Sequence, residues 1–178
     1  IQVEPLKKVG VLPVSLPRIE GTQLAARYLA GTAELDVGGD WFDAIPLAGG
    51  RLGLVVGDVV GKGVQAASTM SQLRNALRAF SLDRMKPSST MARLNLLAEE
   101  VVETAFATVV YVVVDPTAGV CRITSAGHPP PLVAYPDGRV SLVEGGRGLP
   151  LGAGPDTKYG QEVVELPVGT VLLLYSDG

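Results

Sequence analysis

The spacing of apolar residues changes twice along this 178-residue chain, and that order limits the folds it can adopt. Short strand-like runs come first, at 41–47 and 52–56. Apolar residues then recur at helical spacing from Ala66 to Phe80 and again from Met91 to Val101, which places them along one face of each helix. Strand-like runs return at 106–114, 120–125, 132–135, 140–143, 161–166 and 170–175. Strands, two helices and more strands are typical of an α+β domain.

Turn sequences indicate how several of these segments connect. Pro136-Asp137-Gly138-Arg139 predicts a β-hairpin between the runs on either side of it. Pro167-Val168-Gly169 predicts that the last two runs also pair. Pro87-Ser88-Ser89 predicts the start of the second helix, with a serine as its N-cap.

We therefore expect an antiparallel β-sandwich flanked by helices, formed by one domain over residues 23–178. Residues 1–22 contain several prolines and glycines and read as a lead-in or linker. A mixed run at 23–30 is compatible with a further strand, and the glycine-rich stretch 145–156 predicts a loop. The chain begins at Ile1 and ends directly after an apolar run, so we interpret the domain as truncated at its C-terminal end.

Composition excludes several functional classes. The net charge is −3 and the basic residues are scattered, whereas a nucleic-acid interface needs clustered Lys and Arg. No apolar stretch reaches the roughly 18 residues that a membrane span requires. Cys121 is the one cysteine, which excludes a disulfide framework within the chain and predicts a buried thiol. We expect a protein of a reducing compartment, the cytoplasm.

Three acidic residues set beside glycine point to a metal site. They occur in Gly38-Gly39-Asp40, Gly57-Asp58-Val59-Val60-Gly61 and Ser176-Asp177-Gly178, each near the end of a strand-like run. Carboxylates so placed can converge when strands pair, and oxygen ligands without Cys or His suit Mg²⁺ or Mn²⁺. Each acid alone is equally compatible with a turn, and Asp58 with a cap of the following helix. Their repetition favours a metal cluster acting on phosphate.

Other polar residues admit structural interpretations. We interpret Asp36 as a solvated charge in a loop. Asp43 could lie next to the candidate metal ligand Asp40 and help to position it without binding the metal itself. His128, the only histidine, could supply a proton to a leaving group, but its place before three prolines favours a structural hydrogen bond to a loop carbonyl. The Gly57–Gly63 stretch is one residue short of a nucleotide-binding phosphate loop and has Gly63 where Ser or Thr must stand, which excludes that chemistry.

Six motifs in the same order resemble the SpoIIE/RsbU-like bacterial branch of the metal-dependent (type 2C) serine/threonine protein phosphatases. The resemblance runs from about residue 13 to the end of the chain, and its specificity lies in the order of motifs that are each weak alone. The motifs are those at 33–43, 57–67, 106–108, 125–131, 148–152 and 174–178.

The resemblance implies two antiparallel sheets flanked by helices and a centre of two Mn²⁺ or Mg²⁺ ions. Asp58 would bridge both ions, Asp40 and the main-chain carbonyl of Val59 would bind one, and Asp177 would bind the other. A hydroxide formed from metal-bound water would attack phosphorus in line and expel the serine or threonine alkoxide. The family has one more acidic ligand further along than residue 178, so the resemblance leaves the activity of this span open.

The resemblance further implies a substrate that is a phosphorylated signalling protein of the anti-sigma-factor antagonist type. It also implies an upstream regulatory domain, joined through residues 1–22, that often controls such enzymes through homodimerisation. Two alternatives stay open from the sequence. One is a catalytically inactive module of the same fold that binds a partner protein. The other is a metal-dependent hydrolase of small phosphoesters, which a deep substrate pocket would favour.

Overall fold

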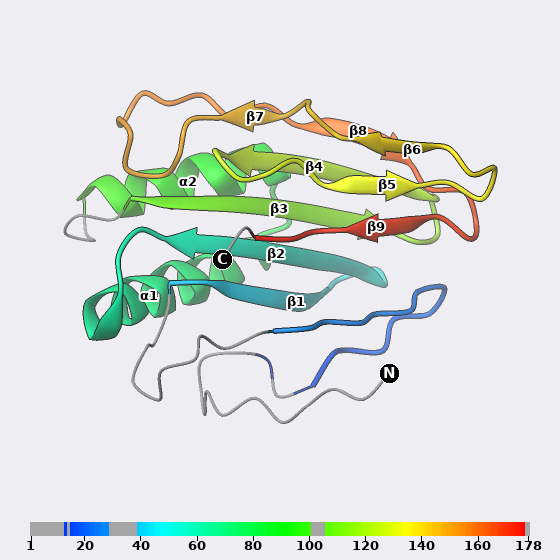
Figure 1. Ribbon diagram of the computed structural model, residues 1–178, viewed down its shortest axis with the longest axis horizontal. Helices are drawn as coiled ribbons and strands as arrows, with labels where there is room; N and C mark the ends of the chain where they lie inside the picture. Colours follow the sequence, from blue (N-terminus) through cyan, green and yellow to red (C-terminus); the bar gives the residue numbers. More distant parts are fainter. Residues whose placement is uncertain (1–12, 14, 29–38, 101–105, 177–178) are drawn as a thin grey trace.

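The computed structural model describes residues 13, 15–28, 39–100 and 106–176. Over these ranges the chain forms two strands, two helices and then seven further strands (Figure 1). The elements are β1 (Trp41–Leu47), β2 (Arg51–Val59), α1 (Gly63–Ser81), α2 (Pro87–Glu100), β3 (Ala107–Asp115), β4 (Val120–Ala126), β5 (Leu132–Ala134), β6 (Val140–Leu142), β7 (Arg147–Gly148), β8 (Glu162–Glu165) and β9 (Val171–Leu173). Neither described helix is long and apolar enough to cross a membrane.

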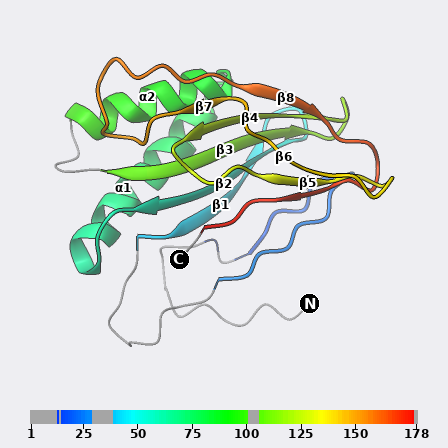
Figure 2. The same cartoon turned by 45° about the horizontal axis from the view of Figure 1, so that its top comes forward.

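The strands form two sheets that pack face to face. In the larger sheet, β1, β2, β3 and β4 follow one another antiparallel, and β4 also pairs with β8 and, in parallel, with the two residues of β7. The smaller sheet has the order β6-β5-β9. Both helices cover one face of the larger sheet, and the smaller sheet covers the other (Figures 1 and 2). The predicted α+β architecture, an antiparallel sandwich flanked by helices, is confirmed.

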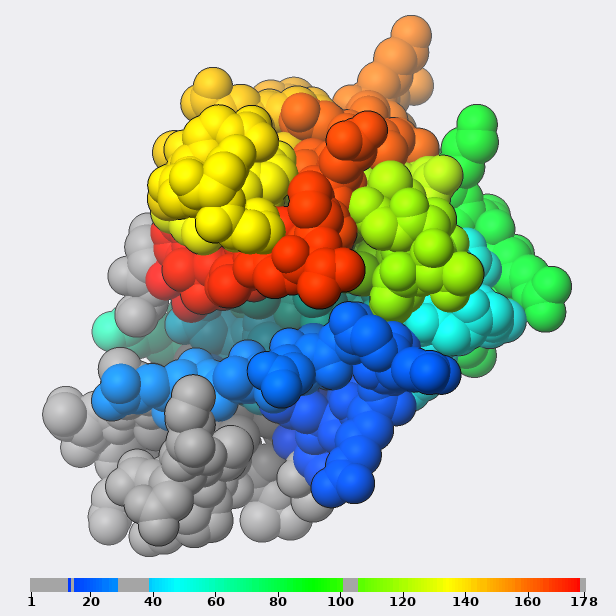
Figure 3. All heavy atoms as spheres, turned by 90° about the vertical axis from the view of Figure 1, so that its right-hand side faces the viewer, coloured from blue at the N-terminus to red at the C-terminus, as the bar shows by residue number. Residues whose placement is uncertain are grey.

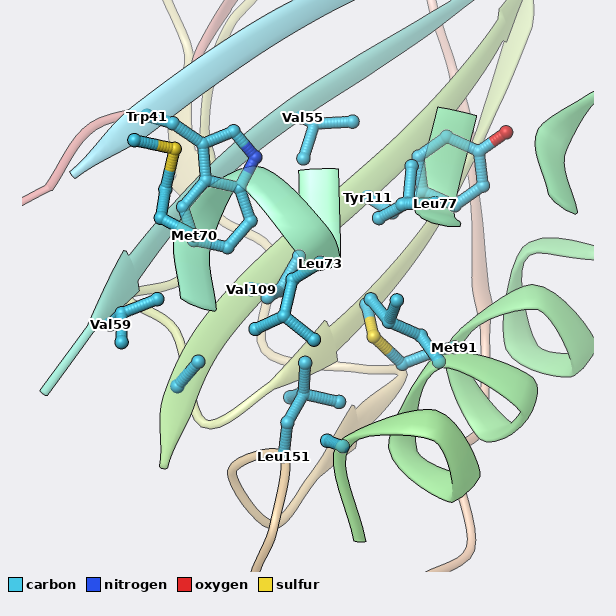
Figure 4. Close-up of a cluster of buried hydrophobic side chains, with 14 of the residues drawn as sticks. Trp41, Val55, Val59, Met70, Leu73, Leu77, Met91, Val109, Tyr111 and Leu151 are labelled. Atoms are coloured by element: carbon cyan, nitrogen blue, oxygen red, sulfur yellow. The ribbon is translucent and has the colours of Figure 1, made fainter. Parts of the chain in front are cut away.

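Successive side chains of each strand point to opposite faces of the larger sheet, so its apolar residues form two separate cores. Trp41 and Val55 face the helices, where they meet the α1 stripe, whereas Leu52 and Val112 face the smaller sheet. The apolar spacing predicted for α1 is confirmed, because its buried apolar residues are Ala66, Met70, Leu73 and Leu77. Figure 4 shows the helix-side core, with Trp41, Val55, Val59, Met70, Leu73, Leu77, Met91, Val109, Tyr111 and Leu151 directed into it.

The start of α2 differs from the prediction in its cap. The helix begins at Pro87, so Ser88 and Ser89 lie within its first turn instead of preceding it. A proline suits the first helical position because the N–H that it lacks would have no partner within the helix. The amides of Ser89 and Thr90 both donate to the Lys86 carbonyl, at 3.0 Å each.

The last two strands do not pair with each other, contrary to the turn-based prediction. β8 pairs with β4 in the larger sheet, and β9 pairs with β5 in the smaller one. Val164 of β8 and Leu172 of β9 both pack into the core between the sheets. Because the two strands cover that core from opposite sides, the intervening turn carries the chain from one sheet to the other.

Two other stretches differ from expectation. Residues 23–28 form no strand, and the rest of the predicted run at 23–30 lies outside the described residues. Figure 3 shows residues 15–28 (blue) lying along the side of the sandwich beneath the residues of the last strands (red). The predicted loop at 145–156 contains the short strand β7, which adds to the edge of β4.

Burial of Cys121 in β4 gives a prediction about its chemistry. The thiol is fully buried, and desolvation raises its pKa from 9.0 to about 12. We expect a thiol reagent at pH 8 to label the native protein far more slowly than the protein in denaturant.

Because the folded pKa of Cys121 exceeds its unfolded value, the thiol's contribution to stability is complete below pH 9.0 and is lost as the pH rises towards about 12. Urea titrations of Cys121→Ala should therefore show a weaker alkaline loss of stability, and rapid native labelling would contradict the assignment.

Candidate metal centre

Asp40 and Asp58 lie opposite each other at one end of the larger sheet. β1 and β2 pair Trp41 with Gly57, and just past this pair the Val59 amide donates to the Gly39 carbonyl at 3.3 Å. Asp40 and Asp58 occupy the positions between these two contacts. Side chains directly opposite on antiparallel strands are close neighbours, with Cβ atoms about 4.5–5.5 Å apart.

Two glycines make this close approach possible. A Cβ atom on Gly39 would lie 2.2 Å from the carbonyl oxygen of Val59. A Cβ atom on Gly57 would lie 2.3 Å from the Trp41 ring. Neither glycine is among those with positive φ, so what these positions need is the missing side chain, not a left-handed backbone.

Both acids face the space between the sheets. Asp58 lies on the same face of β2 as Val56 and Leu54, which pack against the core on that side. Asp40 precedes Trp41, whose ring faces the helices, and Asp40 lines a pocket of about 430 Å³. The same pocket is lined by residues 172–176, which are β9 and the segment that follows it.

The Asp40 carboxylate fits a metal ligand. Its Oδ1 atom is buried and has no hydrogen-bond partner. A buried polar atom without a partner costs roughly 1–3 kcal/mol, and more when it is charged. A cation held between Asp40 and Asp58 would remove this cost, and the Val59 carbonyl, in contact with Gly39, offers a further oxygen ligand.

The third predicted ligand, Asp177, lies outside the described residues, as does Asp36. Among the residues that are described, no three His, Cys, Asp or Glu side chains gather closely enough to hold a metal ion. The structure therefore brings together two of the three predicted acids. The convergence of Asp177 with them stays a prediction, although the pocket beside Asp40 also reaches Ser176, its neighbour in sequence.

Asp58 does not occupy the N-cap position of α1. The N-cap residue of α1 is Lys62, which makes no capping hydrogen bond through its side chain, and Asp58 lies within β2. The sequence places Asp58 close to the helix start, but β2 continues to Val59 and the chain turns before the helix begins.

Asp43 does not lie next to the Asp40 side chain, and this prediction was wrong. The two residues are three apart on the chain, which directs their side chains to opposite faces. The Asp43 carboxylate is buried against α1, where Arg78 Nη1 lies 3.1 Å from Oδ1 and 3.0 Å from Oδ2. Arg74 Nε lies 3.2 Å from Oδ2, and the Ala44 amide donates to Oδ1 at 2.9 Å. The sequence analysis missed this contact; the signal that could have indicated it is a pair of arginines four residues apart, which share one face of α1.

His128 makes the structural hydrogen bond that its sequence context favoured. The side chain is buried, Nε2 lies 3.0 Å from the Tyr175 carbonyl and Nδ1 lies 2.9 Å from the Thr108 hydroxyl. A buried ring with partners at both nitrogens is poorly placed to donate a proton to a substrate. Its role as a hydrogen-bonding residue is confirmed.

Comparison with known proteins places the chain in a family. A family model described as "Stage II sporulation protein E (SpoIIE)" matches residues 48–178. The phosphoserine phosphatase RsbU of Bacillus subtilis is 29% identical over 128 residues, which cover 71% of this chain and 38% of RsbU. The chain spans about a third of the length of the curated relatives it matches.

Solved structures agree with the sequence match. The RsbU and RsbW domains of Rv1364c from Mycobacterium tuberculosis align with a TM-score of 0.73 and 39% identity, covering 84% of this chain and 41% of that one. RsbX, solved in complex with magnesium, aligns with a TM-score of 0.67 and 17% identity, covering 80% of this chain and 68% of that one, a likeness of fold alone. With the family match spanning residues 48–178, the chain belongs to the SpoIIE family and has the fold of its type 2C phosphatase domains.

Proposed function

We propose that this chain forms the catalytic domain of a metal-dependent protein serine/threonine phosphatase. The observation that carries the proposal is the placement of Asp40 opposite Asp58, with a buried carboxylate oxygen that lacks a partner. Membership of the SpoIIE family and the likeness to a protein named phosphoserine phosphatase support the same activity.

Two divalent ions, Mn²⁺ or Mg²⁺, would be held by Asp40, Asp58, the Val59 carbonyl and Asp177. Bound ions of this kind lower the pKa of a coordinated water and neutralise charge on phosphate oxygens. The presence of magnesium in the solved RsbX structure supports such a centre. The protein's own contribution is to fix two carboxylates on neighbouring strands, so that little reorganisation is needed when the ions and the phosphate bind.

The substrate we propose is a phosphoserine or phosphothreonine on a signalling protein of the anti-sigma-factor antagonist type. The name of the relative phosphoserine phosphatase RsbU supports the phosphoserine, and the antagonist type of substrate protein rests on the resemblance of the sequence motifs. We further infer that a regulatory domain of the same polypeptide controls the site, because the matched relatives are much longer than this chain. Homodimerisation and a cytoplasmic location stay predictions from the sequence.

Replacing Asp58 with asparagine should abolish metal-dependent catalysis while the fold persists. The substitution keeps the side-chain shape but removes the negative charge that would bridge the ions, so we expect Mn²⁺-dependent phosphate release to fall by about 100-fold or more. Phosphate release from a phosphorylated antagonist-type protein measures the effect. Asp137→Asn, in the exposed turn between β5 and β6, is the control and should keep full activity. A folded Asp58→Asn enzyme with normal turnover would refute the assignment of Asp58.

Replacing Gly39 with alanine should weaken metal binding through the backbone alone. The new Cβ atom would lie 2.2 Å from the Val59 carbonyl oxygen, so β1 and β2 must separate where Asp40 faces Asp58. We expect the affinity for Mn²⁺, measured by calorimetry, to fall about 10-fold or more. The matched control is Gly160→Ala, whose Cβ atom would meet its nearest neighbour at an ordinary 3.6 Å. Equal Mn²⁺ affinities for the two variants would contradict the proposed geometry.

A further inference from the structure

Two hydrogen bonds through His128 cross the sandwich from β3, beside Asp58, to the segment after β9. Asp58 of β2 pairs in register with Thr108 of β3. The Thr108 hydroxyl lies 2.9 Å from Nδ1 of His128, and Nε2 of the same ring lies 3.0 Å from the carbonyl oxygen of Tyr175. The imidazole ring thus joins the larger sheet, beside the candidate metal centre, to the end of a strand in the smaller sheet.

The partners of His128 define the direction of each hydrogen bond. A carbonyl oxygen can only accept, so Nε2 carries a proton and donates it to Tyr175. In the neutral ring Nδ1 is then the acceptor, and the Thr108 hydroxyl donates to it. The ring therefore donates to Tyr175 and accepts from Thr108, and the contact to Tyr175 depends on a donor located at the Nε2 position.

The loop that presents His128 is itself closely fixed. The Ser125 hydroxyl accepts from the His128 amide and donates to the His128 carbonyl, at 3.2 Å in each case. Gly127 has a left-handed φ of +66°, and a Cβ atom there would lie 2.6 Å from Pro150. The ring is only 1% exposed. These contacts make the loop a rigid support from which the ring reaches across the interior.

We propose that His128 is a positioning residue of the metal centre. It holds the backbone at Tyr175 beside Thr108, and so fixes where the chain leaves the smaller sheet, two residues before Asp177 in the sequence. Asp40, directly before β1, and Asp58, in β2, are set opposite each other by register within one sheet and need no such link. The segment after β9 arrives from the other sheet, so its place relative to Asp58 depends on a contact between the layers. This inference rests on the proposed function.

Two amide variants of His128 test whether the hydrogen-bond donor at the Nε2 position is what matters. Glutamine can place an amide N–H close to the position of Nε2 and keep the hydrogen bond to the Tyr175 carbonyl. Asparagine is one methylene shorter, so its amide reaches the position of Nδ1 and leaves that carbonyl without its donor. The two side chains share the same chemistry, and both remove the aromatic ring.

The experiment is a calorimetric titration of Mn²⁺ into the full-length protein for the wild type, His128→Gln and His128→Asn. We expect His128→Gln to keep a Kd within about 3-fold of the wild type and His128→Asn to raise it by about 10–100-fold, as is usual when a group that supports metal ligands is lost. Denaturant unfolding measured beside it ensures that only folded protein is compared. A purely structural histidine would instead give two folded variants with the same Mn²⁺ affinity.

The protonation state of the ring offers a test that needs no metal. Nitrogen NMR of the metal-free protein should show His128 with Nε2 protonated and Nδ1 unprotonated. Thr108→Val, which removes the hydroxyl at nearly constant volume, should alter the Nδ1 resonance and leave Nε2 protonated. A ring protonated at Nδ1 alone would overturn the inference, because Nε2 could then not donate to Tyr175.

The outcomes distinguish the inference from the function on which it rests. A wild type that binds no Mn²⁺, or an Asp58→Asn variant that binds it as tightly as the wild type, would overturn the proposed function and the inference together. Normal binding by the wild type with an unchanged Kd in His128→Asn would overturn the inference alone. An equal rise in Kd for both His128 variants would do the same, because the donor at Nε2 would then not be what matters.

Discussion

The close contact between the backbones of β1 and β2 at Gly39 and Val59 is the constraint on which the candidate site depends. With a Cβ-to-oxygen distance of 2.2 Å for any side chain at position 39, only glycine lets the strands meet there. That contact continues the strand pairing past Trp41 and Gly57, and so sets Asp40 opposite Asp58. Two like charges held side by side repel each other unless a cation lies between them. The same geometry that requires glycine therefore also favours a bound cation.

The acidic residues on the two faces of the larger sheet lie in different environments. On the helix face, the Asp43 carboxylate is paired with Arg74 and Arg78 and ties β1 to α1. Breaking a buried pair of this kind leaves an uncompensated charge and typically costs about 3–5 kcal/mol. On the other face, Asp40 and Asp58 meet the space between the sheets. The acid tied to α1 and the acid that faces the space between the sheets are therefore only three residues apart, at the same end of β1.

The sequence predicted the parts of this structure that depend on local pattern. Helical spacing identified the buried stripe of α1, and the glycines beside Asp40 and Asp58 indicated close approach near a metal site. It could not predict that β8 and β9 join different sheets, because a turn sequence specifies a change of direction but not which neighbour a strand finds. The contact of Asp43 with α1 was missed for a related reason. Side chains alternate between the two faces of a strand, so the face to which Asp43 points can be assigned only once the bounds of β1 are known.

The position of β9 explains why a buried histidine belongs in this domain. Register within one sheet sets Asp40 opposite Asp58 through main-chain hydrogen bonds, and glycine at positions 39 and 57 leaves room for that pairing. No such register relates β9 to β2, because they belong to different sheets that are held together mainly by apolar packing. Apolar packing has no direction, so it fixes the distance between the two sheets more strictly than it fixes the lateral position of one sheet relative to the other. A hydrogen bond from His128 to a main-chain carbonyl has direction, and it can fix the segment after β9 along the axis that packing leaves free.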